Sequence, residues 1–174
     1  MKIYLNALFI ILMFGNFYCQ AQKVEYTIFK NTTFSIPYPK GWTIDTSRKN
    51  KVELGIYSPK ESADDNFIEN FTLGIKDFSE YENNIDTFIN TFKDNWNKLG
   101  DSLNISKAFI KVGAIPYYKL IYESPKNGLM LKYLQAIWFV KDDLYVMTFV
   151  SEKNKFDAYR GKVEEIINLF ESVK

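Results

Sequence analysis

The stretch Ile137-Trp138-Phe139-Val140-Lys141-Asp142-Asp143-Leu144-Tyr145-Val146-Met147-Thr148-Phe149 decides the fold of this chain. Its two apolar runs are nearly continuous, and only three charged residues separate them. So short a connection predicts a hairpin, and therefore an antiparallel pair of strands over Leu129–Val140 and Leu144–Val150. Apolar runs without polar alternation are typical of strands covered on both faces. We therefore expect other elements to cover both sides of this pair.

Upstream of this pair, shorter runs alternate apolar and polar residues, and a period of two predicts strands with one buried face. These runs lie at Val24–Ile28, Phe34–Ile36, Trp42–Ile44, Val52–Ile56 and Phe71–Ile75, and strands resume at Leu103–Val112 and Tyr117–Tyr122. The segment Ile36-Pro37-Tyr38-Pro39-Lys40-Gly41-Trp42 is turn-like, because each proline holds its predecessor extended and Gly41 permits a positive φ. We expect a hairpin here that returns Trp42 against the strand holding Phe34.

Two segments change to the helical period. In Ile85–Leu99 the apolar residues recur every three or four positions, which places them on one helical face. We expect Asn83 or Asn84 to cap the start of this helix and Gly100 to lie just past its end.

The second helix is expected over Phe156–Val173, with Asn154 as its cap and Asp157 near its positive end. Gly161 inside it costs roughly 1 kcal/mol relative to Ala, so we expect close packing against a neighbour there. The order strands, helix, strands, helix predicts an α+β fold with an antiparallel sheet.

These elements and certain local motifs resemble the PsbP/Mog-like superfamily over essentially all of Lys23–Lys174. The motifs are Phe34–Trp42, Glu69–Leu73, Tyr118–Tyr122, and Leu144–Phe149 followed by the Tyr159–Val173 helix. The resemblance implies an antiparallel β-sheet flanked by helices, an α/β/α sandwich.

The resemblance also implies binding rather than covalent chemistry. Plant members bind at the oxygen-evolving complex of photosystem II, Mog-type members bind a small GTPase, and bacterial relatives include envelope lipoproteins and Eag-type chaperones of secreted effectors. The metal-linked histidines of the photosynthetic members have no counterpart, because this chain contains no histidine. One fold serves many functions, so the resemblance implies no specific partner.

The N-terminal segment reads as a signal peptide over residues 1–21, which leaves 22–174 as a single mature domain. Lys2 precedes an apolar block that is too short to span a membrane as a helix. Cys19 and Ala21 supply the small residues needed before cleavage at Gln22. We therefore expect an exported protein, periplasmic or secreted, with no transmembrane span in the mature chain. An uncleaved anchor is one alternative, and a lipoprotein through Cys19 is another, which the preceding aromatic residues disfavour.

Composition excludes most catalytic chemistry. Without histidine, and with Cys19 as the only cysteine, the mature chain has no histidine triad, no zinc site with His or Cys ligands and no thiol nucleophile. No phosphate-binding or dinucleotide-binding glycine pattern occurs. We therefore predict no enzyme activity, no catalytic residues, no cofactor and no metal.

One acidic loop, residues 61–66, contains residue types that could bind calcium. Calcium accepts oxygen ligands of the kind found in Glu61, Asp64, Asp65 and Asn66. These residues lack the EF-hand spacing, so a solvated loop is the better interpretation.

Nucleic acid is excluded as a partner, because the formal charge is only +1 and the densest basic cluster, 48–51, has no stacking motif beside it.

Aromatic residues leave two interpretations open. They could line an apolar groove, or they could form core and cross-strand pairs, which is more usual at strand positions; the residues are Tyr38, Trp42, Tyr117, Tyr118, Tyr122, Tyr133 and Trp138. Our functional prediction is a non-enzymatic envelope or secreted protein that binds a protein partner or an apolar ligand, with binding residues and role unknown. The alternatives are an Eag-like chaperone, which requires the cytoplasm, and a calcium-assisted or hydrolytic enzyme.

Overall fold

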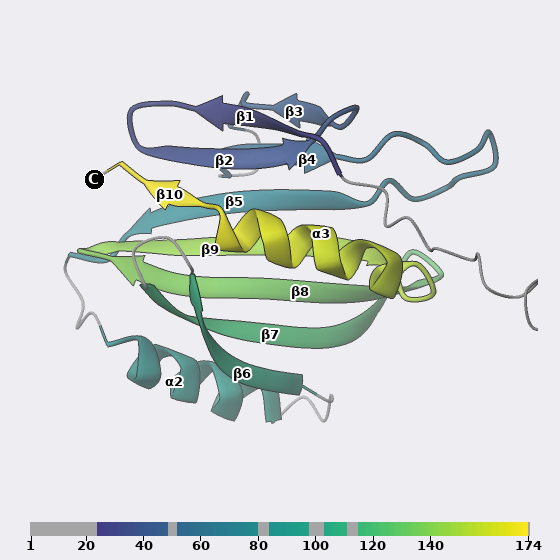
Figure 1. The fold of residues 1–174 in the computed structure, drawn as a ribbon. Coiled ribbons are helices and arrows are strands. Elements are labelled where there is room, and N and C mark those ends of the chain that lie inside the picture. The colour runs from purple at the N-terminus through teal and green to yellow at the C-terminus, as the bar shows by residue number, and fades with distance from the viewer. Residues whose placement is uncertain (1–23, 49–51, 80–83, 98–102, 111–114, 174) are drawn as a thin grey trace, which may run out of the picture.

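The computed structural model describes residues 24–48, 52–79, 84–97, 103–110 and 115–173. Its elements, in chain order, are β1 (Tyr26–Lys30), β2 (Phe34–Pro39), β3 (Thr43–Asp45), β4 (Leu54–Tyr57), β5 (Asn70–Asp77), α2 (Ile85–Asn97), β6 (Leu103–Ile110), β7 (Ile115–Lys126), β8 (Leu129–Val140), β9 (Asp143–Glu152), α3 (Phe156–Asn168) and β10 (Glu171–Ser172). The strands form a seven-stranded sheet of order β3-β4-β5-β9-β8-β7-β6 and a three-stranded sheet of order β1-β2-β10 (Figure 1). Every pairing in both sheets is antiparallel.

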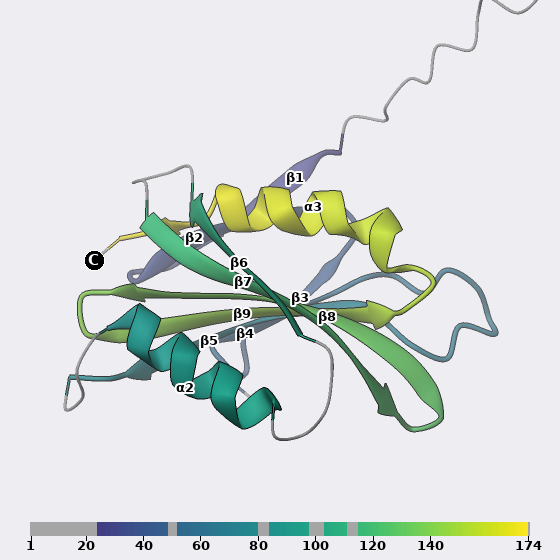
Figure 2. The same ribbon diagram turned by 90° about the horizontal axis from the view of Figure 1, so that it is seen from below.

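The two helices lie on opposite faces of the seven-stranded sheet, and the smaller sheet lies on the α3 side (Figure 2). The main core fills the space between the sheet, α3 and β2, and a second core cluster lies under α2 around Ile89, Leu120, Ile137 and Leu144. The fold is therefore the predicted α+β arrangement, an antiparallel sheet flanked by helices.

The central hairpin is the predicted one. β8 and β9 pair through a turn at which Lys141 has a φ of 53°. Trp138 faces Tyr145 across the two strands, with ring centroids 5.4 Å apart, and both side chains are fully buried on the α3 side. Neighbouring Ile137 is buried on the α2 side. The continuous apolar run therefore reflects cover on both faces, as predicted.

Helix α2 also follows the sequence pattern. Asn84 Oδ1 accepts hydrogen bonds from the backbone N–H groups of Asp86 and Thr87 at 3.0 and 3.1 Å, so Asn84 is the cap. Ile89 is buried against the sheet, and Gly100 lies outside the described residues.

The predicted hairpin between Phe34 and Trp42 is wrong. The turn itself forms, with a φ of 91° at Gly41, but β2 pairs with β1 and β10, whereas β3 pairs with β4 in the other sheet. Pro37 and Pro39 carry no N–H group, so the β2 edge facing away from β1 is a poor partner for a returning strand. Trp42 instead contacts the ring of Tyr159 on α3, with centroids 5.8 Å apart.

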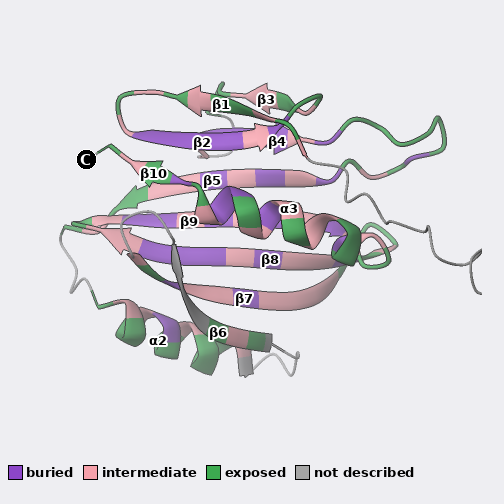
Figure 3. Cartoon of the chain, in the orientation of Figure 1, coloured by how far each residue is buried: buried purple, intermediate pink, exposed green. Residues whose placement is uncertain are grey.

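Buried residues concentrate in the central strands such as β9, whereas β1 is exposed or intermediate throughout (Figure 3). Three smaller expectations are also corrected. Ile28 is 68% exposed, and Phe29 contacts the core instead. The cap position of α3 is Lys155 and not Asn154, and no side chain caps the helix there. The helix ends at Asn168 and not at Val173, whose N–H bonds to the Thr33 carbonyl beside the β10–β2 pairing.

Candidate functional site

The end of the sheet at which three connections meet carries the candidate site. These are the loop from β4 to β5, the β7–β8 turn and the β9–α3 junction (right-hand side of Figure 1). We call this region, residues 58–69, 126–131 and 152–157, the loop end of the sheet. The pairing of β9 with β5 and with β8 positions these connections, because the register of the paired strands determines where each connection leaves the sheet.

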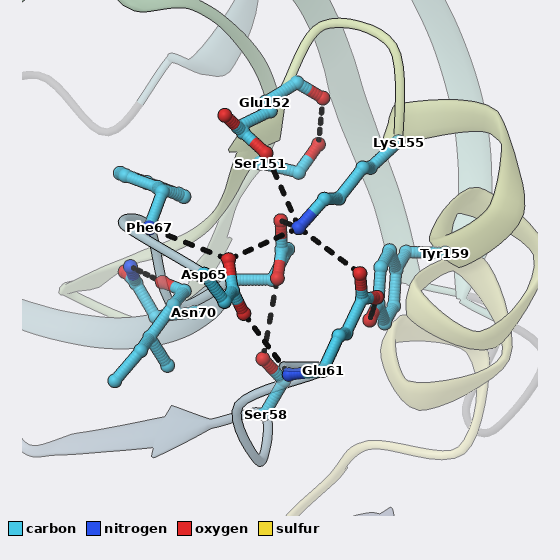
Figure 4. Close-up of polar contacts among 11 residues, drawn as sticks. Ser58, Glu61, Asp65, Phe67, Asn70, Ser151, Glu152, Lys155 and Tyr159 are labelled. Atoms are coloured by element: carbon cyan, nitrogen blue, oxygen red, sulfur yellow. Dashed lines mark hydrogen bonds and ion pairs between the residues drawn. The ribbon is translucent and has the colours of Figure 1, made fainter. Parts of the chain in front are cut away.

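A single lysine holds the loop end together. Lys155 Nζ lies 3.0 Å from Glu61 Oε2, 3.2 Å from Asp65 Oδ1 and 3.2 Å from Glu152 Oε2, with Glu69 Oε1 at 3.7 Å (Figure 4). An ammonium group has three N–H donors, so the three nearest carboxylates can use all of them. Lys155 therefore ties the β4–β5 loop to the start of α3.

Two of these carboxylates are buried. The side chain of Asp65 is 2% exposed, and that of Glu69 is 0% exposed. Removing such charges from water is costly unless hydrogen bonds replace the lost solvation. Asp65 accepts hydrogen bonds from the backbone N–H groups of Glu61 and Phe67, and Ser58 Oγ donates one to Glu69 Oε2 at 3.3 Å. Glu69 Oε1 accepts no hydrogen bond from the described residues.

The pKa values follow from these contacts. The hydrogen bond from Tyr159 and the contact with Lys155 lower the pKa of Glu61, and the backbone N–H of Glu61 lowers that of Asp65, with help from Lys155. Burial raises the pKa of the Glu69 carboxyl. Burial alone would lower the pKa of Lys155, but its hydrogen bonds to the carboxylates outweigh that effect and raise it.

This arrangement keeps Lys155 protonated, so the side chain is an electrostatic anchor and not a general base. The Ser58 hydroxyl donates a hydrogen bond to the Glu69 carboxylate. A nucleophilic serine needs a base that can take its proton, and Lys155 with a raised pKa cannot do so.

Three hollows open around the cluster. One of about 290 Å³ is lined by Glu61, Ser62, Asp64, Asp65, Asn66, Leu129, Glu152 and Lys155. A second, of about 530 Å³, is lined by Asn66, Phe67, Lys126, Asn127, Leu129 and Leu131. A third, of about 500 Å³, is lined by Met130, Glu152, Lys153, Asn154 and Asp157. The first hollow shares Asn66 and Leu129 with the second and Glu152 with the third. Met130 in the third hollow is 47% exposed, and Ile68, next to Phe67 in the chain, is 37% exposed.

The loop considered for calcium thus belongs to the site, but in another role. Asp65 is buried against Lys155 rather than solvated, whereas Asp64 and Asn66 remain exposed. Across the part of the chain that the structure describes, no group of acidic residues has the geometry to hold a metal ion.

Sequence reasoning missed Lys155, Glu69 and Glu152. The only local signal was the three-residue spacing of Glu152 and Lys155 between a strand and a helix.

The aromatic residues singled out above pack in the core and against neighbouring strands. Tyr117 and Trp138 are buried. Tyr122 stacks on its cross-strand partner Tyr133 with centroids 4.8 Å apart, and burial raises the pKa of Tyr122 to about 12. Trp42 packs on Tyr159. The core interpretation of these residues therefore holds.

The remaining sequence candidates lie elsewhere. Arg48 forms an ion pair with Glu53 at 2.8 Å, and the rest of the basic cluster, 49–51, lies outside the described residues. The proposed signal peptide and Cys19 also lie outside them. In the described ranges, the helices are neither long nor apolar enough to cross a membrane.

Comparison with known proteins gives similarity at the level of structure. No family model matches the sequence, and no curated protein matches it. The solution structure of cyanobacterial PsbP (CyanoP) from Synechocystis is similar with a TM-score of 0.60 and 14% identity, over 88% of this chain and 95% of that one. LpqN of Mycobacterium tuberculosis, described as involved in cell envelope biogenesis, is similar with a TM-score of 0.60 and 14% identity, over 87% of this chain and 92% of that one.

A eukaryotic structure is similar as well. The Ran-binding protein Mog1p of Saccharomyces cerevisiae has a TM-score of 0.55 and 9% identity, over 87% of this chain and 97% of that one. The fold of this chain is therefore the PsbP/Mog-like fold that its sequence motifs resemble.

Proposed function

We propose that this protein is an exported, non-enzymatic binding protein that recognises a protein partner with the loop end of the sheet. The observation that carries the proposal is the Lys155 cluster, which anchors the β4–β5 loop beside a hollow that shares lining residues with two others. Binding loops are most effective when a rigid scaffold positions them, because less conformational entropy is then lost on association.

The state of the Lys155 side chain supports a binding role. Lys155 is held as an ammonium by its carboxylate partners, and the chain has no histidine. The Ran-binding protein Mog1p is a precedent for protein recognition on this fold.

A protein partner suits the site better than a small apolar ligand. Small-molecule sites are usually concave and mostly apolar, whereas the hollows here lie side by side and mix carboxylates, amides and lysines with three apolar residues, Phe67, Leu129 and Leu131. Exposed Met130 adds an adaptable apolar contact of the kind enriched in protein interfaces.

Site-specific photo-crosslinking in the native host tests the proposal. A photoreactive phenylalanine analogue replaces Met130 at the loop end, and the matched control places it at Ile28 on β1, which is 68% exposed. We expect a discrete protein adduct from position 130 only. Equal adducts at both positions, or none at position 130, would contradict a partner site at the loop end.

Intact mass of the mature chain tests export independently. We expect an N-terminus at Gln22 in the envelope or secreted fraction. A chain that begins with modified Cys19 would make the protein a lipoprotein. An intact chain beginning at Met1 in the cytoplasm would overturn export and favour the Eag-like chaperone alternative.

A further inference from the structure

We propose that the loop end of the sheet binds a segment of its protein partner in which a lysine or arginine lies within two positions of a large apolar residue. The inference rests on the proposed function and adds the chemistry of the partner. It follows from the adjacency of an anionic hollow and an apolar one.

The anionic hollow favours a cation. Four carboxylates line it, those of Glu61, Asp64, Asp65 and Glu152, against one ammonium, that of Lys155. Asp64 is exposed and belongs to none of the ion pairs of Lys155. Charges in a concave, partly desolvated site interact more strongly than on an open surface, so the hollow attracts an ammonium or guanidinium group.

Glu69 adds to the negative charge of the cluster, although it pairs with Lys155 and does not itself line the anionic hollow. Its side chain is fully buried behind Lys155, and its Oε1 atom accepts no hydrogen bond from the described residues. The N–H donors of Lys155 are directed to Glu61, Asp65 and Glu152, which lie closer to its Nζ atom than Glu69 does. The cluster thus holds more carboxylate than its one cation can satisfy. A guanidinium that pairs with Glu61 or Glu152 would free a Lys155 N–H for Glu69.

The apolar hollow defines the second half of the partner motif. Phe67, Leu129 and Leu131 line it, and it shares Asn66 and Leu129 with the anionic hollow. An extended segment advances about 3.3 Å per residue, so neighbouring or next-but-one side chains can enter the two hollows together. Lys126 borders the apolar hollow only, and its charge keeps the cationic residue on the Glu61–Glu152 side.

Three matched peptides test this inference. Each contains Leu-Ser-Xaa in an otherwise identical neutral sequence, where Xaa is arginine, its neutral isostere citrulline, or glutamate. Binding to the mature chain is followed by titration calorimetry and by amide shifts in heteronuclear NMR. We expect the arginine peptide to bind and to shift amides in 58–69, 126–131 and 152–157. The citrulline peptide should bind about tenfold more weakly, because a partly desolvated charge pair is lost.

Two variants make the test specific. Asp64→Asn removes a lining charge without touching the Lys155 network, and we expect it to weaken the arginine peptide several-fold. Asp94→Asn removes an exposed charge on α2 and should change nothing. Leu129→Ala should weaken all the peptides that bind, because Leu129 lines both hollows.

The outcomes separate this inference from the proposed function. Equal binding of the arginine and citrulline peptides, stronger binding of the glutamate peptide, shifts outside the loop end, or equal effects of Asp64→Asn and Asp94→Asn would each overturn the inference. No binding of the arginine peptide combined with a discrete adduct at position 130 would overturn the cationic motif and leave the protein-binding function standing. Failure of both experiments would overturn both proposals.

Discussion

At the scale of single residues, Lys155 is the most consequential polar side chain described. It is 22% exposed, and it faces two carboxylates that are almost or entirely buried, those of Asp65 and Glu69. Removing one partner of a buried ion pair leaves uncompensated charge, which costs far more than the pair itself contributes. The lysine is therefore more important for holding the loop in place than a count of its ion pairs would suggest.

We predict that Lys155→Met lowers the free energy of unfolding by about 3 kcal/mol at pH 7. The contacts of Glu61 and Asp65 depress their pKa values in the folded state. Their stabilising effect is present above the unfolded pKa values and is lost as the pH falls through the folded ones. The deficit of the variant should therefore shrink in acid. Urea denaturation across this pH range measures it.

Lys153→Met is the matched control. Lys153 is 55% exposed and pairs with Glu123 at the surface, so its loss should cost less than about 1 kcal/mol at any pH. A Lys155→Met variant as stable as this control would show that the cluster does not anchor the loop.

Replacing Glu69 should have the opposite effect on stability from replacing Lys155. Burial raises the pKa of its carboxyl, so the folded state favours the protonated form, and the charged form opposes folding at neutral pH. We predict that Glu69→Gln raises the urea midpoint at pH 7. The gain should disappear as the pH falls through the raised pKa, because the wild-type carboxyl is then neutral as well. A lower midpoint at pH 7 would mean that the attraction to Lys155 outweighs burial.

At the scale of elements, two glycines contrast. Gly161 was expected to reflect close packing, yet a Cβ at this position in α3 would meet no atom within 4 Å. Gly128 has a φ of 81° in the β7–β8 turn, where side-chain-bearing residues are strained. We predict that Gly161→Ala stabilises the protein by up to about 1 kcal/mol, whereas Gly128→Ala destabilises it by about 1–2 kcal/mol. Thermal unfolding compares the two, and destabilisation by Gly161→Ala would restore the packing explanation.

Elements with local signals were predictable from the sequence. β8 follows from its apolar run and the short charged turn after it, and the cap and face of α2 follow from Asn84 and the helical spacing; each signal is local in the sequence. The partner of β2 was not predictable, because β10 lies more than 130 residues away and its two residues have no strand pattern. The Lys155 cluster was hidden for the same reason, since Asp65 is 90 residues from Lys155.

At the scale of the whole molecule, Phe170 contacts aromatic rings of both sheets. Phe170 is 1% exposed, and its ring lies 5.9 Å from that of Phe34 on β2 and 5.2 and 5.7 Å from those of Trp138 and Tyr145 in the main sheet. It immediately precedes β10, which pairs with β2. The C-terminal segment therefore supplies the smaller sheet with part of its apolar contact and with its third strand.

We predict that Phe170→Ala costs about 3–5 kcal/mol, the usual loss when a buried phenylalanine leaves a cavity. The loss of protection from hydrogen exchange should differ between the strands. In hydrogen exchange, the amides of β1 and β2 should lose protection first, because Phe170 and β10 hold them to the molecule, whereas β8 and β9 retain extensive pairing with each other. Leu169→Ala is the control, since Leu169 is 41% exposed and its truncation should cost less than about 1 kcal/mol. Equal loss of protection in all four strands would mean that the two sheets unfold as one unit.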